Sequence, residues 1–193
     1  MLNHISDLRT LRLDLQLAMI VVITALVSLS MYVFMPDSFK NKPCGDCSGG
    51  YIIPATNLIQ GKGLVDNNGV LTTARPPGSP IIIAGLLYVQ RWLDMSQQKV
   101  FWMFNSLMIA FSAILLLMIS QLIWENQDAV FVPYVWITYP FLLWFINQPY
   151  PEIPYFVASF FTVYMFLRSY RQSSRKYWVY GLIVGLLSAV GMM

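Results

Sequence analysis

Residues 15–35 form a mostly apolar stretch that follows Arg9 and Arg12. A helix needs about 20 consecutive apolar residues to cross the hydrocarbon core of a bilayer, and this stretch has that length. A secretory signal peptide has a shorter apolar core that ends in a small-residue cleavage site, which is missing here before Pro36. The sequence therefore predicts a retained membrane helix over residues 14–35.

Composition supports the same conclusion for the whole chain. Of its 193 residues, 57% are hydrophobic and only 11% are charged, which leaves too little polar surface for a soluble globule of this size. The formal net charge is +3, and the basic residues are scattered or lie at the ends of apolar segments. Nucleic-acid binding needs a dense basic patch instead. We expect an all-α membrane protein that does not bind nucleic acid.

Four later segments have the composition of membrane helices: residues 100–124, 130–147, 153–168 and 178–193. Together with 14–35 they predict about five transmembrane helices in a single region, 1–193. The last segment reaches Met193 without a polar flank, although a spanning helix needs a few more residues. We expect this helix to be truncated and the chain to be the N-terminal part of a larger protein.

The charge of the loops predicts the orientation. Residues 168–176 contain four basic and no acidic residues, which is typical of a cytoplasmic loop. If residues 80–92 lie on the membrane instead of crossing it, the N-terminus is cytoplasmic too, and residues 36–99 and 147–152 both face outward. If residues 80–92 cross the membrane, one of the two basic ends must face outward. An apolar run of this length is more often interfacial than spanning.

The first outward loop, residues 36–99, has its own pattern. Tyr51, Ala55 and Leu58 recur at helical spacing, which predicts a short helix lying on the membrane. Glycines at 61 and 63 are typical of a helix end, and residues 66–69 are typical of a turn. Arg75 precedes two prolines, which disfavour a helical conformation for it and hold it in an extended segment.

This loop resembles the first extracytoplasmic loop of GT-C glycosyltransferases, in particular the protein O-mannosyltransferase and aminoarabinose transferase superfamily. The resemblance covers roughly residues 36–167. It is carried by the order Asp46, Tyr51-x-x-x-Ala55-x-x-Leu58-x-x-Gly61-x-Gly63, and then Arg75-Pro76-Pro77-Gly78-x-Pro80. Asp46 stands five residues before the tyrosine, whereas the family usually has its acid four residues before it, at the position of Cys47 here. The neighbouring glycines are pliable enough to absorb the extra residue.

The resemblance implies interfacial helices in this loop and a catalytic acid at Asp46. It also implies a lipid-phosphate ligand at Arg75 and a second acidic residue in the next outward loop, the place of Glu152. Lys62 and Tyr51 join Arg75 as candidate residues for binding the lipid phosphate. The implied reaction moves a sugar from a polyprenyl-phosphate donor to an extracytoplasmic lipid, glycan or protein, in an enzyme of the bacterial plasma membrane.

The physical chemistry of such a transfer suits these residues. A carboxylate can take the proton of the attacking hydroxyl, and a guanidinium stabilises the charge that grows on the leaving phosphate. Each residue also has an ordinary explanation. Asp46 can be a turn residue, Arg75 an anchor to anionic headgroups, and Glu152 an acid in the first turn of a helix. Two carboxylates without histidines do not specify a metal site, so we predict no cofactor and leave a divalent metal open.

Cys44 and Cys47 form a C-x-x-C pair around Asp46. In an oxidising compartment this pair predicts either a local disulfide that fixes the loop or a thiol-exchange site. A quinone-linked membrane thiol oxidoreductase normally needs a second cysteine pair, and the chain has only two cysteines. We prefer the structural disulfide and keep the thiol oxidoreductase as an alternative function. A non-catalytic membrane subunit or lipid transporter is another alternative, although the predicted spans contain few of the polar residues expected for it.

Overall fold

The computed structural model describes residues 2–36, 48–71, 76–124, 130–172, 178–183 and 185–186, and the regular structure of these residues is helical apart from one isolated bridge between Val65 and Leu71. The prediction of an all-α chain is confirmed. The elements are α1 (Leu2–Phe34), a π-helical turn η1 (Ser48–Ile52), α4 (Ile53–Ile59), α5 (Gly78–Leu93), α6 (Gln97–Ile123), α7 (Val132–Ile137), α8 (Pro140–Phe145) and α9 (Glu152–Gln172). A further helical segment covers residues 178–183 and 185–186.

Within the described residues, two helices are long and apolar enough to cross a membrane: Leu13–Phe34, which belongs to α1, and α6. They correspond to the predicted segments 14–35 and 100–124. In their most apolar windows, only 17% of the residues in α1 and 39% of those in α6 are buried inside the structure. The apolar core helix of a soluble protein is mostly buried, so the exposed apolar surface of these two helices favours lipid as their surroundings.

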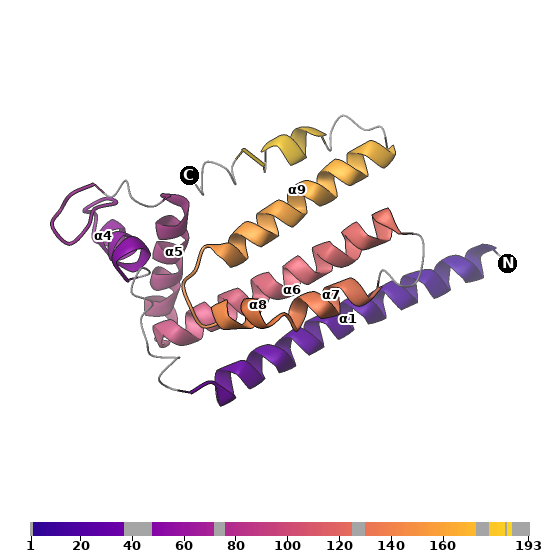
Figure 1. The fold of residues 1–193 in the computed structure, drawn as a ribbon, viewed down its shortest axis with the longest axis horizontal. Helices are drawn as coiled ribbons and strands as arrows, with labels where there is room; N and C mark the ends of the chain where they lie inside the picture. The colour runs from indigo at the N-terminus through magenta and orange to yellow at the C-terminus, as the bar shows by residue number, and fades with distance from the viewer. Residues whose placement is uncertain are drawn as a thin grey trace.

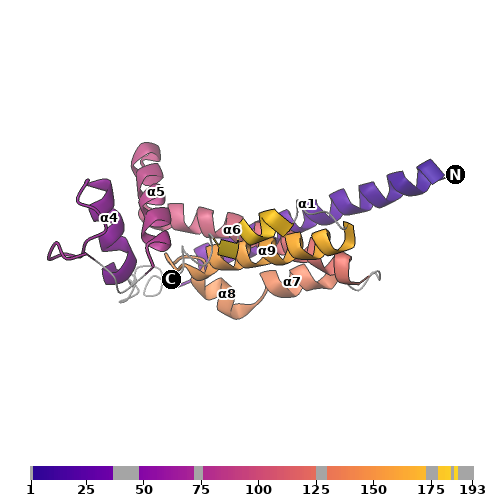
Figure 2. The same cartoon turned by 90° about the horizontal axis from the view of Figure 1, so that it is seen from above.

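Helices α1, α6 and α9 run alongside one another, whereas α4 and α5 lie across one end of this bundle (Figure 1). The view from above shows the same arrangement, so the crossing is not an effect of projection (Figure 2). We call η1, α4 and α5 the platform. Helix α1 ends near the platform, and α6 and α9 begin near it (Figure 1).

The transverse direction of α5 bears on whether residues 80–92 cross the membrane. Because α5 runs across α6 in both views (Figures 1 and 2), the two helices cannot both follow the normal of one bilayer. If α6 crosses the membrane, α5 lies along its surface. The arrangement therefore favours the interfacial interpretation of this segment.

Residues 130–147 do not form the single helix that the sequence predicts. They contain two helices of six residues each, α7 and α8, separated at Thr138 and Tyr139. Tyr139 has an extended backbone, with φ −65° and ψ 119°, because the ring of the following Pro140 disfavours the helical conformation. Six helical residues extend only about 9 Å. Two short helices thus take the place of the single helix predicted over 130–147, and the membrane crossing of this segment stays a prediction.

Helix α9 starts one residue before the predicted segment 153–168 and continues to Gln172. It packs along α6, and the core of the bundle lies around α6. This core joins residues from α1, α6, α7, α8 and α9: Ile20, Ile109, Ala113, Leu117, Ile137, Leu142, Phe145, Ile146 and Ile153.

A single buried amide holds the chain after α8 against α6. Asn105 is 3% exposed, and its Nδ2 atom donates to the carbonyl oxygens of Phe145, Ile146 and Gln148 at 3.1, 3.0 and 2.9 Å. Carbonyl groups at the end of a helix have no partner within that helix. The Asn105 amide supplies a partner for such carbonyls and holds the start of residues 147–152 against α6; the Phe145 carbonyl also accepts from the Gln148 backbone N–H at 3.1 Å.

We expect Asn105→Leu to lower the free energy of unfolding by about 1–3 kcal/mol, because the buried carbonyl oxygens lose the hydrogen bonds from this amide. Unfolding by SDS in detergent micelles, followed by tryptophan fluorescence, measures the change. Gln121→Leu is the matched control, since the exposed Gln121 amide makes only a long contact of 3.4 Å with Gln16. Equal destabilisation by the two substitutions would contradict the role given to Asn105.

Candidate functional site

The residues proposed from the sequence fall into two groups. Four of them lie outside the described residues: Cys44, Asp46, Cys47 and Arg75. Tyr51, Lys62 and Glu152 are described, and the structure places each of them. The geometry of the candidate site is therefore that of the platform and of the joint formed by residues 147–152.

Tyr51 belongs to the packed interior of the platform. It is 7% exposed and forms one apolar cluster with Ala55 of α4, three residues of α5 and Phe101 of α6; the α5 members are Ile83, Ala84 and Leu87. The tyrosine ring thus helps to attach the platform to the first turns of α6. The helical spacing of the residues from Tyr51 to Leu58 reflects this packing, because the same face of α4 is buried against α5.

Lys62 lies on a tightly built loop that follows α4. Its backbone N–H donates to the carbonyl of Asn57 at 2.9 Å, and the Asn57 side chain donates to the carbonyls of Val65 and Asp66 at 2.8 and 3.1 Å. Gly61 and Gly63 on either side have φ angles of 76° and 84°, a backbone conformation that residues other than glycine rarely adopt. The loop therefore has a defined shape and presents an exposed Lys62 side chain.

The predicted turn at residues 66–69 is confirmed. Asp66 Oδ1 accepts hydrogen bonds from the backbone N–H groups of Asn68 and Val70 at 2.8 and 2.9 Å. Gly69 has φ 77°. An aspartate that bonds to the backbone two residues ahead is typical of an Asx turn.

The joint contains two buried oxygen atoms that accept no hydrogen bond. Asn147 is 4% exposed and donates through Nδ2 to the Met35 sulfur at 3.2 Å. Among the described residues, no donor reaches Asn147 Oδ1 or Glu152 Oε2, and both atoms are buried. An unsatisfied buried acceptor costs about 1–3 kcal/mol, and such groups in native structures call for an explanation such as a catalytic or binding role.

Glu152 is the first residue of α9. A negative charge at the N-terminus of a helix is favourable. The position of Glu152 therefore agrees with its simpler interpretation as a first-turn acid that stabilises the helix. The dipole acts on the charge as a whole, so it does not assign a partner to the Oε2 atom. Within the described residues, no donor reaches the Oε2 atom of this carboxylate.

The joint contacts the platform directly. Tyr150 packs against the cluster that contains Tyr51, and its ring meets that of Phe145 edge to face, with the centroids 4.7 Å apart. The platform and the Glu152 joint thus lie at the same end of the bundle. The structure brings Tyr51 and the Glu152 joint together through Tyr150, whereas Lys62 stands on the exposed loop beyond α4.

Sequence reasoning missed the residues that build the joint. Asn105 and Asn147 are single polar residues in or beside apolar runs. One polar residue changes the mean hydropathy of such a run very little. Met35 gives no signal in the sequence. Within the described part of the chain, no group of three or more His, Cys, Asp or Glu residues is placed to hold a metal ion.

Comparison of the chain with protein-family models, with curated proteins and with solved structures finds no match.

Labelling with a membrane-impermeant maleimide tests whether the platform and the joint lie on the same side of the membrane. The background protein carries Cys44→Ser and Cys47→Ser. We expect Lys62→Cys and Gln148→Cys to behave alike, because the platform and the joint lie together. Both should react in intact cells, because both are expected to face outward. Arg171→Cys, in the last turn of α9 at the other end, should react only after permeabilisation.

Opposite accessibility of positions 62 and 148 would contradict the arrangement. If only position 171 reacts in intact cells, the platform and the joint still lie on the same side of the membrane, but that side is the cytoplasmic one.

Proposed function

We propose that the protein is a membrane glycosyltransferase that moves a sugar from a polyprenyl-phosphate donor to an extracytoplasmic acceptor. The observation that carries the proposal is the buried, unpaired Glu152 oxygen in a joint that packs against the platform. Together with the motif of the first loop, this observation supports a site at the platform end. The proposed topology has about five membrane helices, with the platform at the outer surface and the N-terminus in the cytoplasm.

In the proposed reaction the acceptor hydroxyl attacks the anomeric carbon of the sugar. Asp46 takes the hydroxyl proton, the bond from the anomeric carbon to the phosphate oxygen breaks, and the lipid phosphate leaves with the electron pair. Arg75 stabilises that phosphate, because a guanidinium presents two parallel donors to its oxygens. Lys62 adds a second positive charge at the surface.

Glu152 has a different proposed role, which is to orient the acceptor. Its unpaired Oε2 atom can accept a hydrogen bond from an acceptor hydroxyl next to the reacting one. The neighbouring Asn147 Oδ1 atom, also unpaired among the described residues, can accept another. Fixing a substrate hydroxyl in this way contributes through positioning.

The first test measures release of radiolabelled sugar from mannosyl-phosphoryl-polyprenol in membranes that contain the protein. We expect Asp46→Asn to lower the rate about 10²–10⁴-fold, as loss of a general base does. Glu152→Gln should raise KM for the acceptor more than it lowers kcat, because an orienting contact is weakened while the base stays. Asp66→Asn, on the exposed turn, is the matched control and should leave the rate unchanged. Full activity of Asp46→Asn would remove the base assignment.

The second test separates transfer from thiol chemistry. We expect the double substitution Cys44→Ser and Cys47→Ser to keep most of the transferase activity, because the sulfurs have no step in the proposed reaction. Cross-linking to a photoactivatable polyprenyl phosphate should also persist in this variant and fall in Arg75→Gln. Loss of all activity in the serine variant, with Asp46→Asn unaffected, would favour a thiol oxidoreductase instead.

A further inference from the structure

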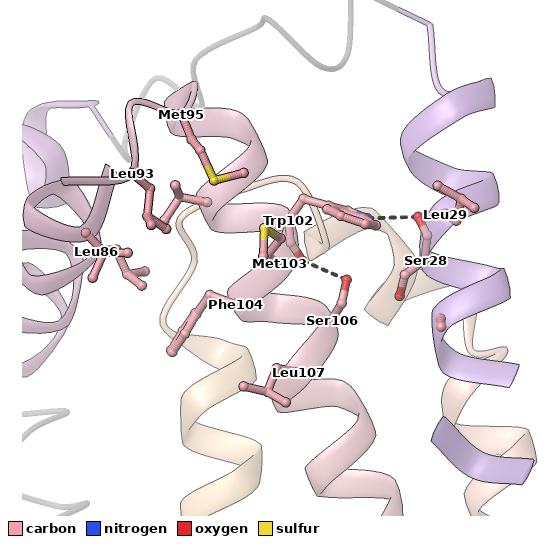
Figure 3. Close-up of a pocket in the computed structure, with 13 residues that line it drawn as sticks. Ser28, Leu29, Leu86, Leu93, Met95, Trp102, Met103, Phe104, Ser106 and Leu107 are labelled. Atoms are coloured by element: carbon pink, nitrogen blue, oxygen red, sulfur yellow. Dashed lines mark hydrogen bonds between the residues drawn. The ribbon is translucent and has the colours of Figure 1, made fainter. Parts of the chain in front are cut away.

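An apolar groove of about 570 Å³ lies where α1, α5 and α6 meet. Figure 3 shows its lining, which includes Ser28 and Leu29 of α1, Leu86 of α5, and Met103 and Leu107 of α6. Its volume is in the range of about 300–1,000 Å³ that is usual for small-molecule sites. The groove lies on the side of α6 that faces α1 and α5, whereas Asn105 points toward the joint.

Two polar side chains of the groove wall, Trp102 and Ser106, are engaged with the protein. The Trp102 indole Nε1 donates to the carbonyl of Ser28 at 2.9 Å, and the Ser106 hydroxyl donates to the carbonyl of Trp102 at 2.6 Å (Figure 3). The rest of the lining is almost entirely hydrocarbon and thioether. A sugar or another polar ligand would lose its hydration there without gaining partners. The wall suits a hydrocarbon chain.

The groove opens beside exposed apolar side chains. Leu29 is 49% exposed, Met103 48% and Leu107 64%. The groove lies between α1 and α6, the two described helices that are long and apolar enough to cross a membrane. If these helices cross a bilayer, the groove opens to the surrounding lipid, and the chains next to it are acyl chains.

A positive charge stands at the platform end of the groove. Lys99 is exposed and lies in the first turn of α6, one turn before Met103 and on the same side of the helix. The N-terminus of α6 adds partial positive charge at this place, where the Ser96 side chain accepts from the Lys99 backbone N–H. Asp94, the carboxylate of the α5–α6 turn, is also exposed. The groove is complementary to an anionic phospholipid. The Lys99 cation matches the headgroup, and the apolar wall matches the acyl chain.

We propose that this groove binds one acyl chain of an anionic phospholipid, with the lipid phosphate at Lys99. The bound lipid fills the corner between α1, α5 and α6 and ties the platform to the two apolar helices. The site is separate from the joint that carries Glu152. Its test reads bound lipid and no transfer reaction, so its outcome does not depend on the proposed function.

Native mass spectrometry of the purified, delipidated protein after addition of phosphatidylglycerol or phosphatidylcholine tests the proposal. We expect one phosphatidylglycerol to be retained per chain. Leu29→Trp fills the groove and should abolish this retention. Leu26→Trp is the matched control, because Leu26 lies on the same helix and is exposed but is not part of the groove wall. It should retain the lipid as the unchanged protein does.

The charge is tested separately. Lys99→Gln should weaken retention of phosphatidylglycerol about fivefold, the effect of one basic residue near an anionic lipid, and weaken that of phosphatidylcholine less, because the choline cation offsets the phosphate charge. Arg91→Gln is the control, because Arg91 is exposed and lies on the side of α5 away from Val89 and Leu93, which line the groove. Asp94→Asn should not weaken retention.

Three outcomes would overturn the proposal. Equal retention by Leu29→Trp and Leu26→Trp would place the lipid elsewhere. Displacement of the lipid by glycerol phosphate alone would show that the acyl chain contributes nothing. A dimer that carries no lipid and is lost in Leu29→Trp would show that a second copy of the chain covers the groove.

Discussion

The hydrogen bonds of the Asn105 amide are the interaction on which the candidate site depends. One side chain in an apolar helix serves carbonyl oxygens of Phe145, Ile146 and Gln148. A buried backbone carbonyl without a partner costs about 1–3 kcal/mol, so these contacts favour a place against α6 for the chain after α8. Glu152 follows a few residues later, and its position at the platform end is a consequence of this contact.

The broken segment α7–α8 makes the same point about backbone groups. Non-helical backbone in a buried place is tolerated where side chains or other backbone groups provide hydrogen-bond partners. At the break, the Thr138 hydroxyl donates to the carbonyl of Tyr134 at 2.9 Å, while Ile137 and Leu142 on either side are buried in the core. The short helices thus cover α6 as a folded segment would, although their apolar composition is that of a spanning helix.

The difference between α6 and the broken segment α7–α8 shows which features can be predicted from the sequence. Length and apolar composition closely predict α6 and the apolar part of α1, Leu13–Phe34, because both properties are sums over a segment and need no knowledge of partners. The turn at Asp66 is also predictable, since its hydrogen bonds are local. The break before Pro140 is a backbone effect that a sum of hydropathies does not register. The role of Asn105 depends on carbonyls about 40 residues away, so no local pattern reveals it. For the candidate site, the sequence predicts Glu152 but not the two asparagines that set its surroundings.

The first turns of α6 join these features, because successive faces of the helix meet different partners. Phe101 and Asn105 lie one turn apart on one face and contact the platform and the joint. Trp102, on the next face, attaches the helix to α1 by donating to the carbonyl of Ser28. Met103 and Leu107 line the apolar groove. A polar site and an apolar groove can therefore lie close together without sharing side chains, and a shift of α6 along its axis would disturb both at once.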